Sequence, residues 1–326
     1  MKDFGVLGSG ISGSTIAKLL SNKFSLEVFE KAKGVGGRAS NRRYIKNLSF
    51  DHGAQYIHPK NKNFNKFISF LVSKKVLKKW SGNHLNSSFN KEKKKIKYIG
   101  IKGNNNISKF LLKKIKKNCS SKIININFNS NFWSITLQDG SQLSFKNLIL
   151  TCPFPQVKDL ANKYLNKNIR NLRVDMQPNI TVMLAYNGNE NISVSSFKFN
   201  DKMLGWAANE NSKKRFKSKC KLWTIQTNEK WAKKYINNFK KNKSKITLKV
   251  INRFLKLTGL KKQSIVFSNI HGWKYSFNYK KTNLKSYWSK KYNLGICGDW
   301  FMGPKIEHAW LSANDLFKKI NKKKPA

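Results

Sequence analysis

Cysteine is scarce in this sequence, and its spacing excludes several classes of protein. The four cysteines, Cys119, Cys152, Cys220 and Cys297, lie far apart and form no C-x-x-C pair. A zinc site or a redox-active dithiol needs closely spaced thiols, and a disulfide framework is not expected in a chain of this length. We therefore predict no metal site and expect the four thiols to be small buried side chains.

Long apolar runs are also missing. No stretch of 18 apolar residues occurs, so no membrane-spanning helix is predicted. The sequence begins with a short apolar run and a glycine turn, without the basic, apolar and small-residue order of a signal peptide. We expect a cytoplasmic protein. An apolar fraction of 39% over 326 residues is enough for an ordinary core, in two domains or one large one.

Acidic side chains are few, with 15 carboxylates against 66 lysines and arginines and a formal charge of +51. Such an excess would suit a nucleic-acid or polyanion binder, which remains an alternative. Lysine is spread along the whole chain, however, and arginine, the preferred reader of phosphates, occurs only seven times. A compositional drift of the coding sequence explains this pattern better. The charge should still attract anionic ligands, and less so at high salt.

A glycine-rich turn follows the first apolar run. After Phe4–Leu7, the residues Gly8, Gly10 and Gly13 stand in G-x-G-x-x-G spacing, and a helical pattern begins at Ile11. In this motif the first glycine makes the tight turn, the second lets a pyrophosphate approach, and the third lets the helix pack closely on the strand. The unpaired amides at the helix start would face the phosphates, so this segment predicts a dinucleotide site.

The residues after the second predicted strand, 26–29, distinguish one dinucleotide from another. Glu30 stands where a carboxylate accepts hydrogen bonds from a ribose hydroxyl and would repel a 2′-phosphate. The glycine-rich loop 34–37 ends in Arg38, whose guanidinium can bind a pyrophosphate with two hydrogen bonds. A site for a nicotinamide dinucleotide alone has no need of this loop.

Three segments resemble a known family. Residues 30–38 (EKAKGVGGR) resemble the second half of the adenine-flavin fingerprint of the flavin amine oxidase superfamily, and residues 50–56 (FDHGAQY) are similar to its renalase-like branch. Residues 298–313 (GDWFMGPKIEHAWLSA) resemble the closing fingerprint of the same superfamily. The resemblance implies an α/β fold, in which a Rossmann-like FAD-binding domain of the glutathione-reductase and amine-oxidase type carries a mixed-sheet substrate domain.

The order of predicted elements divides the chain between these two domains. We expect the FAD-binding domain to comprise residues 1–60, 99–155 and 286–326, and the substrate domain to comprise residues 61–98 and 156–285. In the middle of the chain, a helix over 107–115, a strand over 123–128, a hairpin and a buried strand over 148–150 are similar to the central part of the family's flavin domain. Near the end, Pro304 is expected as the first helical residue.

The resemblance assigns cofactor contacts to particular residues. Asp299 would accept a hydrogen bond from a ribityl hydroxyl, and Ile123 would meet the adenine ring through its main chain. Glu307 is either a helix cap or a flavin contact. The complete predicted set is Gly8, Gly10, Ile11, Ser12, Gly13, Glu30, Lys31, Gly37, Arg38, Gln55, Tyr56, Ile123, Gly298, Asp299, Glu307, Ala309 and Trp310.

The substrate pocket is predicted from aromatic residues. Residues 271–275 (HGWKY) resemble a renalase-like strand that passes the flavin, although the family usually has an arginine near Lys274. Trp273, Tyr275 and Trp206 are the candidate pocket residues, and no catalytic residue is assigned. We expect His52 and His58 to support the cofactor loops rather than to act as an acid or a base.

The implied function is that of a renalase-like, FAD-dependent oxidoreductase. It would oxidise a small substrate, such as an isomer of a reduced nicotinamide nucleotide, by hydride transfer to flavin N5, and oxygen would reoxidise the flavin and give hydrogen peroxide. An anionic dinucleotide would suit the basic surface better than a cationic amine, but a flavin amine oxidase remains an alternative. No cysteine is placed to attach the flavin, so we expect FAD to bind non-covalently. The oligomeric state is left open.

Overall fold

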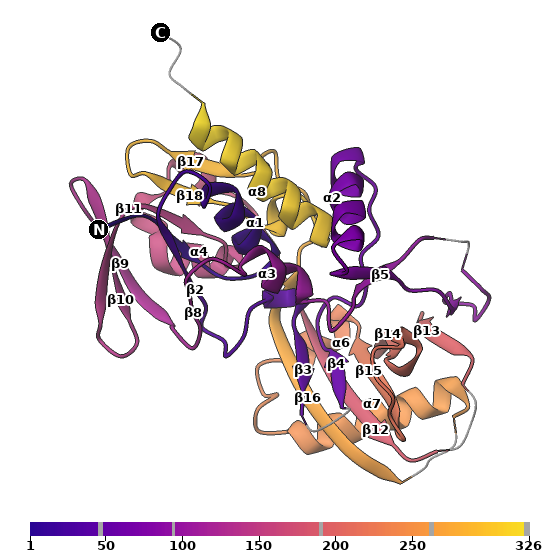
Figure 1. Ribbon diagram of the computed structural model, residues 1–326. Helices are drawn as coiled ribbons and strands as arrows, with labels where there is room; N and C mark the ends of the chain where they lie inside the picture. The colour runs from indigo at the N-terminus through magenta and orange to yellow at the C-terminus, as the bar shows by residue number, and fades with distance from the viewer. Residues whose placement is uncertain (45–47, 93–94, 189–191, 261–263, 323–326) are drawn as a thin grey trace.

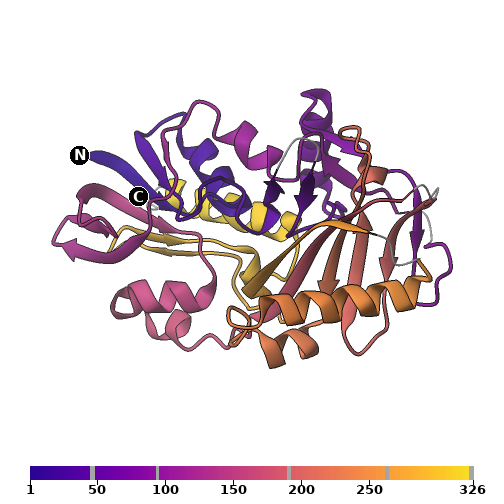
Figure 2. The same ribbon diagram turned by 90° about the horizontal axis from the view of Figure 1, so that it is seen from below.

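The computed structural model describes residues 1–44, 48–92, 95–188, 192–260 and 264–322, which form two bodies, each built on its own sheet (Figure 1). The first body holds the N-terminal strand and the C-terminal helix α8 (Ile306–Asn321). The second body is built mainly from the middle of the chain and carries the long helix α7 (Lys243–Thr258) on its outer face (Figure 2).

The first sheet has a parallel centre, in the strand order β17-β18-β11-β1-β2-β8. Parallel strands buried on both faces are rich in apolar residues, as residues 4–7 are. Residues 26–29 include the buried Glu27, which pairs with Lys2 and Lys116. An antiparallel meander of β9, β10 and β11 extends this sheet. The strands of the whole sheet are β1 (Lys2–Leu7), β2 (Leu26–Phe29), β8 (Lys117–Asn118), β9 (Ile123–Asn129), β10 (Phe132–Leu137), β11 (Gln142–Leu150), β17 (Tyr287–Ser289) and β18 (Leu294–Ile296).

Helices cover both faces of the first sheet. On one face, α1 (Ile11–Leu20) and α8 pack together, and Val6 and Val28 share a core with Ile16 and Leu316. On the other face, α4 (Phe154–Ala161) shares a core with strand residues such as Leu150. This three-layer arrangement places the start of α1 and the start of α8 at the same edge of the sheet, where the parallel strands end (Figure 1).

The second sheet has six strands in the order β16-β12-β15-β14-β13-β6, and it is antiparallel except where β6 joins β13. Alternation along β12 sends Ile180, Val182 and Leu184 into a core with α7 and α6 (Glu229–Tyr235), while Asn179 faces the first body. The strands are β6 (Asn83–Leu85), β12 (Gln177–Tyr186), β13 (Val194–Lys198), β14 (Leu204–Asn209), β15 (Lys221–Thr227) and β16 (Ile265–Phe277).

The remaining elements connect the two bodies. α2 (Lys62–Ser73) packs against α8, and α4 packs into the first core. The predicted substrate domain includes α2, and its predicted boundary at residues 155 and 156 falls inside α4. The small sheets and short helices are β3 (Asn41–Arg43), β4 (Ser49–Asp51), β5 (Leu77–Lys79), β7 (Tyr98–Gly100), α3 (Asn106–Leu111) and α5 (Lys167–Arg170).

Several local predictions need correction. The strands predicted around residues 143 and 148 are one continuous strand, β11, because its two halves pair with β10 and β1 in succession. α8 begins at Ile306 with Lys305 as its N-cap, so Pro304 precedes the helix instead of starting it. Cys297 is buried, but the other three cysteines are partly exposed. Within the described residues, no helix is both long and apolar enough to cross a bilayer.

Candidate functional site

A cavity of about 1840 Å³ lies between the two bodies and is lined by both. The first body contributes the glycine turn, the 30–44 segment and the start of α8. The second contributes residues from β12, β14, β15 and β16. Ligand pockets usually enclose about 300–1,000 Å³. This cavity therefore has room for a large cofactor and a substrate together.

The start of α1 forms one end of the cavity. The N-cap Gly10 forms a bridge to Gly36, Ile11 lines the cavity, and no side chain caps the helix. A Cβ atom on Gly13 would lie 1.9 Å from the carbonyl oxygen of Gly8, so only glycine lets the helix rest on this turn. The first-turn amides and the positive end of the helix dipole are thus free to meet an anion.

Glu30 follows β2 at the same end of the cavity. Its carboxylate accepts hydrogen bonds from the hydroxyl of Ser9 at 2.7 Å, from the amide of Ser9 at 3.1 Å and from the amide of Ala32 at 2.9 Å. These three donors fix the carboxylate at the cavity wall. Its oxygens keep further lone pairs with which to accept hydrogen bonds from a ribose hydroxyl.

Arg38 and Asp299 come from opposite ends of the chain and form a bidentate ion pair. The Nη2–Oδ1 distance is 2.7 Å and the Nη1–Oδ2 distance is 3.0 Å. Arg38 Nη1 also donates to the carbonyl of Ser276 on β16. The sequence predicted separate ligand contacts for the two side chains, whereas the structure joins them. The pair holds the glycine-rich loop against the C-terminal turn and brings both fingerprints to one cavity.

The start of α8 is the second uncapped helix end at the cavity. Its N-cap Lys305 makes no side-chain cap, and Ile306 and Glu307 line the cavity. Glu307 Oε1 accepts from the amides of Lys60, at 2.8 Å, and Asn61. Asn61 is the N-cap of α2, so Glu307 ties the first turn of α8 to the start of a neighbouring helix. Both α1 and α8 therefore direct unsatisfied amides at the same space.

Most of the predicted cofactor residues meet at this cavity, and three lie outside its lining. Gly13 and Gly298 support the turns from behind. Trp310 packs on Phe64 and Phe67 of α2, at 5.5 and 5.3 Å between ring centroids. Those in the lining are Gly8, Gly10, Ile11, Ser12, Glu30, Lys31, Gly37, Arg38, Gln55, Tyr56, Ile123, Asp299, Glu307 and Ala309.

The three predicted pocket residues line the part of the cavity nearest the second sheet. Trp273 Nε1 donates to the carbonyl of His52 at 2.9 Å, and the two rings stack at 5.2 Å. Trp206 packs beside Tyr56 with ring centroids 5.6 Å apart. The ring of Trp273, held by its hydrogen bond and by stacking, forms a rigid wall against which a planar substrate can lie.

A cluster of basic and aromatic side chains beside Trp273 was not predicted from the sequence. Arg42 Nη2 donates to Nδ1 of His271 at 3.1 Å, and the ring of His271 lies 5.1 Å from that of His52. Burial lowers the pKa of His52 to about 3 and that of His271 to about 4, and the charge of Arg42 adds to both shifts. Both histidines are neutral at pH 7. No local motif links Arg42 to His271, because they are 229 residues apart.

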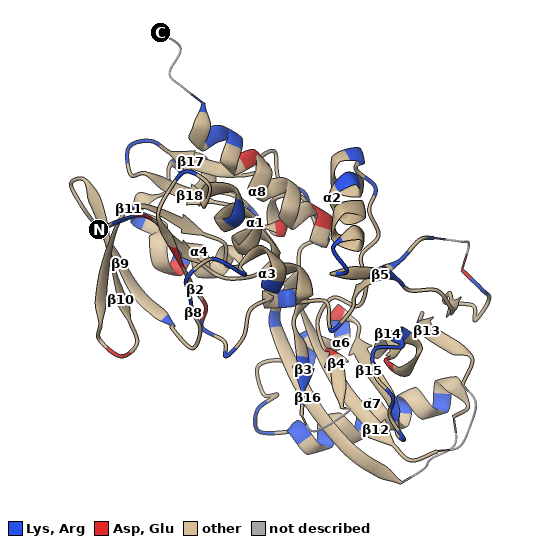
Figure 3. Cartoon of the chain, in the orientation of Figure 1, with Lys and Arg blue, Asp and Glu red and all other residues tan. Residues whose placement is uncertain are grey.

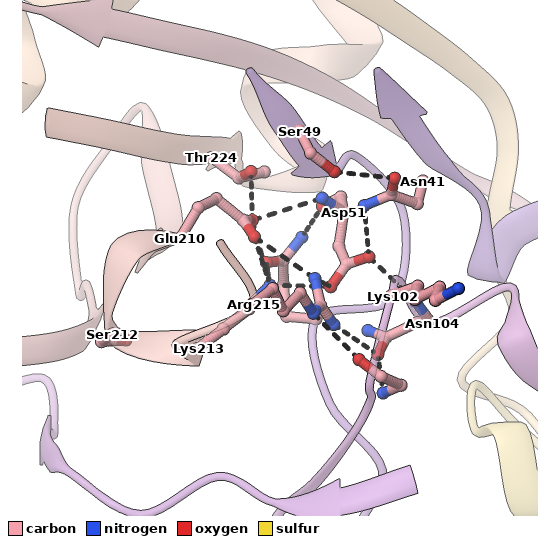
Figure 4. Close-up of polar contacts among 12 residues, drawn as sticks. Asn41, Ser49, Asp51, Lys102, Asn104, Glu210, Ser212, Lys213, Arg215 and Thr224 are labelled. Atoms are coloured by element: carbon pink, nitrogen blue, oxygen red, sulfur yellow. Dashed lines mark hydrogen bonds and ion pairs between the residues drawn. The ribbon is translucent and has the colours of Figure 1, made fainter. Parts of the chain in front are cut away.

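A cluster of buried charged side chains links β4 to the segment that follows β14 (Figure 4). Lys213 lies 2.9 Å from Asp51 and 2.9 Å from Glu210, and Arg215 lies 2.6 Å from Asp51. Burial alone would raise the pKa of Asp51, but Arg215 and Lys213 hold it below its usual range. Lys213 also donates to Gln55, a cavity residue, at 3.3 Å. The sequence held no signal for this cluster beyond the segment 50–56.

Comparison with known proteins gives a family match and a small number of curated relatives. Residues 6–71 match the family described as an NAD(P)-binding Rossmann-like domain. Renalase from Mus musculus is 28% identical over 175 residues, which are 49% of this chain and 50% of renalase. The chain thus matches about half the length of that relative.

Solved structures resemble nearly the whole chain. A proposed protoporphyrinogen oxidase from Exiguobacterium sp. 255-15 has a TM-score of 0.75 at 9% identity, over 98% of both chains. Cyclohexylamine oxidase from Brevibacterium oxydans IH-35A has a TM-score of 0.73 at 10% identity, also over 98% of both chains. At such low identity these likenesses show the fold alone.

Fold and site together define an α/β protein with a Rossmann-like dinucleotide-binding domain and the fold of the flavin amine oxidases. Within that class, about half of the chain is similar in sequence to renalase. The predicted fold class and the predicted resemblance are both confirmed.

Proposed function

We propose that the protein is a renalase-like, FAD-dependent oxidoreductase that acts on a small substrate. The observation that carries this proposal is the convergence of two uncapped helix starts, α1 and α8, on one cavity that also has an aromatic wall. A dinucleotide cofactor needs an anion site at its centre and polar contacts at its far end. Helix amides supply both kinds of contact without a dedicated side chain.

The residues at the cavity fit FAD. Gly10 and Gly37 have no side chains, so their backbones can approach each other and remain accessible to a ligand. A Cβ atom on Gly37 would lie only 3.0 Å from Gly10 Cα. Glu30 offers acceptors for a ribose, and Arg38 and Asp299 lie between the two helix ends, where a pyrophosphate and a ribityl chain would pass. The described cysteines argue for non-covalent binding. Cys297 is not in the cavity lining, and burial raises the pKa of Cys152, which lines the cavity, to about 12.

Bound FAD would supply N5 as hydride acceptor, and reoxidation by O₂ with uptake of a proton would return it to the oxidised state and release hydrogen peroxide. The chain itself positions the reactants. Trp273 and Tyr275 would orient the substrate, and the neutral His52 holds the Trp273 ring by stacking. Because a hydride carries both electrons of the broken C–H bond, this arrangement needs exact placement of the donor carbon more than a strong base.

An amine substrate is the second candidate, and the aromatic pair Tyr56 and Trp206 favours it. The two rings line the cavity 5.6 Å apart and could accommodate a cation through their faces. Against it stands the charge of the lining, where Lys31, Arg42 and Lys274 would repel an ammonium group. We therefore place an anionic nucleotide, such as an isomer of a reduced nicotinamide nucleotide, ahead of an amine.

Two further functions are less well supported. Nucleic-acid binding would need basic residues gathered on one surface, but lysines and arginines occur along both bodies (Figure 3). A dehydrogenase that uses a nicotinamide cofactor alone would leave the Arg38–Asp299 pair and the uncapped start of α8 without a ligand.

An absorption spectrum of the purified protein tests the proposal first. We expect a flavin spectrum, release of FAD on denaturation, and bleaching when a reduced nicotinamide isomer is added without oxygen. Bleaching by an amine instead would select the second candidate. A protein that binds no flavin after incubation with FAD would exclude both.

A further inference from the structure

Arg42 is an arginine without a carboxylate partner inside the cavity. Its guanidinium donates to His271 Nδ1 at 3.1 Å and to the hydroxyl of Tyr44 at 3.5 Å. Within the described residues no ion pair includes Arg42, although Arg38, Arg215 and Arg253 each pair with an aspartate. Arginine carries five N–H donors, so Arg42 keeps donors for a ligand.

Two more cations line the same cavity. Arg43 follows Arg42 on β3, so its side chain leaves the opposite face of the strand, where it donates to the carbonyl of Lys102. Arg43 and Lys109 both line the cavity, and neither has a carboxylate partner among the described residues. Burial lowers the pKa of Lys109, and the positive charges of Arg43 and Lys102 lower it further. This crowding of like charges means that a positive potential at this wall is not neutralised by the protein.

The contact with Arg42 also fixes the tautomer of His271. Because a guanidinium can only donate, Nδ1 of His271 must accept, and the proton of the neutral ring is on Nε2. Among the described residues no acceptor binds that Nε2. Arg42 and His271 together therefore present hydrogen-bond donors and no acceptor, which suits an oxyanion.

This donor pair lies next to the proposed substrate wall. His271 and Trp273 are two residues apart on β16 and so face the same side of the sheet, with ring centroids 4.3 Å apart. The phosphate-binding turn at Gly10 belongs to the other body. A ligand that lay against Trp273 would bring an attached anionic group to Arg42, at a site separate from the start of α1.

We propose that Arg42 and His271 form a second anion subsite that binds a phosphate or carboxylate group of the substrate. The subsite rests on the proposed function in that it assumes a substrate held against Trp273. Arg42 would determine specificity, because a substrate that lacks the anionic group would leave its guanidinium without a counter-ion.

Calorimetric titration of the FAD-loaded protein with inorganic pyrophosphate and, separately, with succinate tests this subsite, since FAD fills the start of α1. For Arg42→Met we expect at least a tenfold rise in the Kd of one of the two anions. His271→Phe, which keeps a ring of similar size, should also weaken binding. The control Arg170→Met removes the same charge from an exposed side chain whose one hydrogen bond within the described residues goes to the carbonyl of Leu165, and its Kd should match the wild type.

Weakening for pyrophosphate alone would assign the subsite to a phosphate, and weakening for succinate alone would assign it to a carboxylate. The inference is overturned if neither anion binds, if Arg42→Met binds like the wild type, or if Arg170→Met weakens binding equally, which would indicate non-specific attraction to a basic surface. Thermal unfolding of each variant checks folding. A protein that binds no flavin even after incubation with FAD would defeat the proposed function but leave the Arg42-dependent titration readable, because calorimetry needs no flavin signal.

Discussion

The two ends of the cavity are built in different ways. The end at α1 is made mostly of main chain, with glycines, helix amides and a single short stretch of sequence from Gly8 to Arg38. The end at the second sheet is made of side chains such as Arg42, Trp206 and His271, which stand on strands that are far apart in sequence. A site formed by main-chain atoms depends on a fixed backbone conformation. A site formed by side chains can acquire a different ligand specificity when those side chains are substituted. The first end suits a fixed cofactor and the second a variable substrate.

Removing the lysine of the buried charge cluster should have the largest effect. Lys213→Met would leave Asp51 and Glu210 with a single cation, Arg215, among side chains that are at most 2% exposed. Breaking such a buried pair costs about 3–5 kcal/mol. We expect the free energy of unfolding in urea to fall by that amount, with both bodies affected.

Lys18→Met on the exposed side of α1 is the matched control for this change. The same substitution there removes a solvated charge and should change stability by less than about 0.5 kcal/mol. If Lys213→Met lowered the free energy of unfolding no more than the control does, the buried cluster would not be a main source of stability.

The substrate end should also make stability depend on pH. The pKa values of His52 and His271 are lowered to about 3 and about 4, so the unfolded chain binds more protons than the folded chain below pH 6.5. The stability from keeping these rings neutral is present above pH 6.5 and is lost as the pH falls towards 4. Each ring contributes a slope of up to about 1.4 kcal/mol per pH unit.

Replacing the histidines separates this effect from the titration of carboxylates. His52→Gln and His271→Gln should each have a shallower fall in stability between pH 6.5 and 4 than the wild type, measured by urea unfolding at a series of pH values. Parallel curves for variant and wild type would mean that the rings are not held neutral in the folded protein.

The contrast between main chain and side chain also explains what the sequence could predict. The glycine turn, Glu30 and the two helix starts have short-range signatures, because each glycine is required by its own neighbours. The sequence therefore predicted most of the residues that line the cofactor end of the cavity, but it predicted no strand order for either sheet. The continuity of β11 was missed because its two halves pair with different partners, which the local pattern does not reveal.

Contacts between residues far apart in the sequence could not be predicted from local sequence patterns. Asp51 and Lys213 are 162 residues apart, and a single acidic residue in a lysine-rich chain gives no sign of which lysine it will meet. The Arg38–Asp299 pair was missed for a different reason. Both residues were predicted as ligand contacts. That their opposite charges could pair with each other was not predicted.

The role of the α1 end of the cavity in binding FAD can be tested by adding a single methyl group to a glycine. Gly13→Ala would place a Cβ atom 1.9 Å from the carbonyl oxygen of Gly8 and push α1 away from the turn. Overpacking of this kind costs about 1–3 kcal/mol, so we expect FAD to bind about 10- to 100-fold more weakly in a fluorescence titration. Gly34→Ala in the neighbouring loop meets nothing within 4 Å and should bind FAD like the wild type. Equal affinities for the two variants would show that α1 does not position the cofactor.

The smallest expected effect concerns the one side-chain pair at the cofactor end. Arg38→Lys keeps the charge but cannot make both hydrogen bonds to Asp299, and it loses the donor to the Ser276 carbonyl. Because the pair is partly exposed, we expect a loss of only about 1 kcal/mol, or about fivefold in FAD affinity. Arg170→Lys, on a side chain far from the cavity lining, should leave the affinity unchanged. Unchanged affinity in Arg38→Lys would mean that only its charge matters, and that the loop and the C-terminal turn are aligned by the main chain alone.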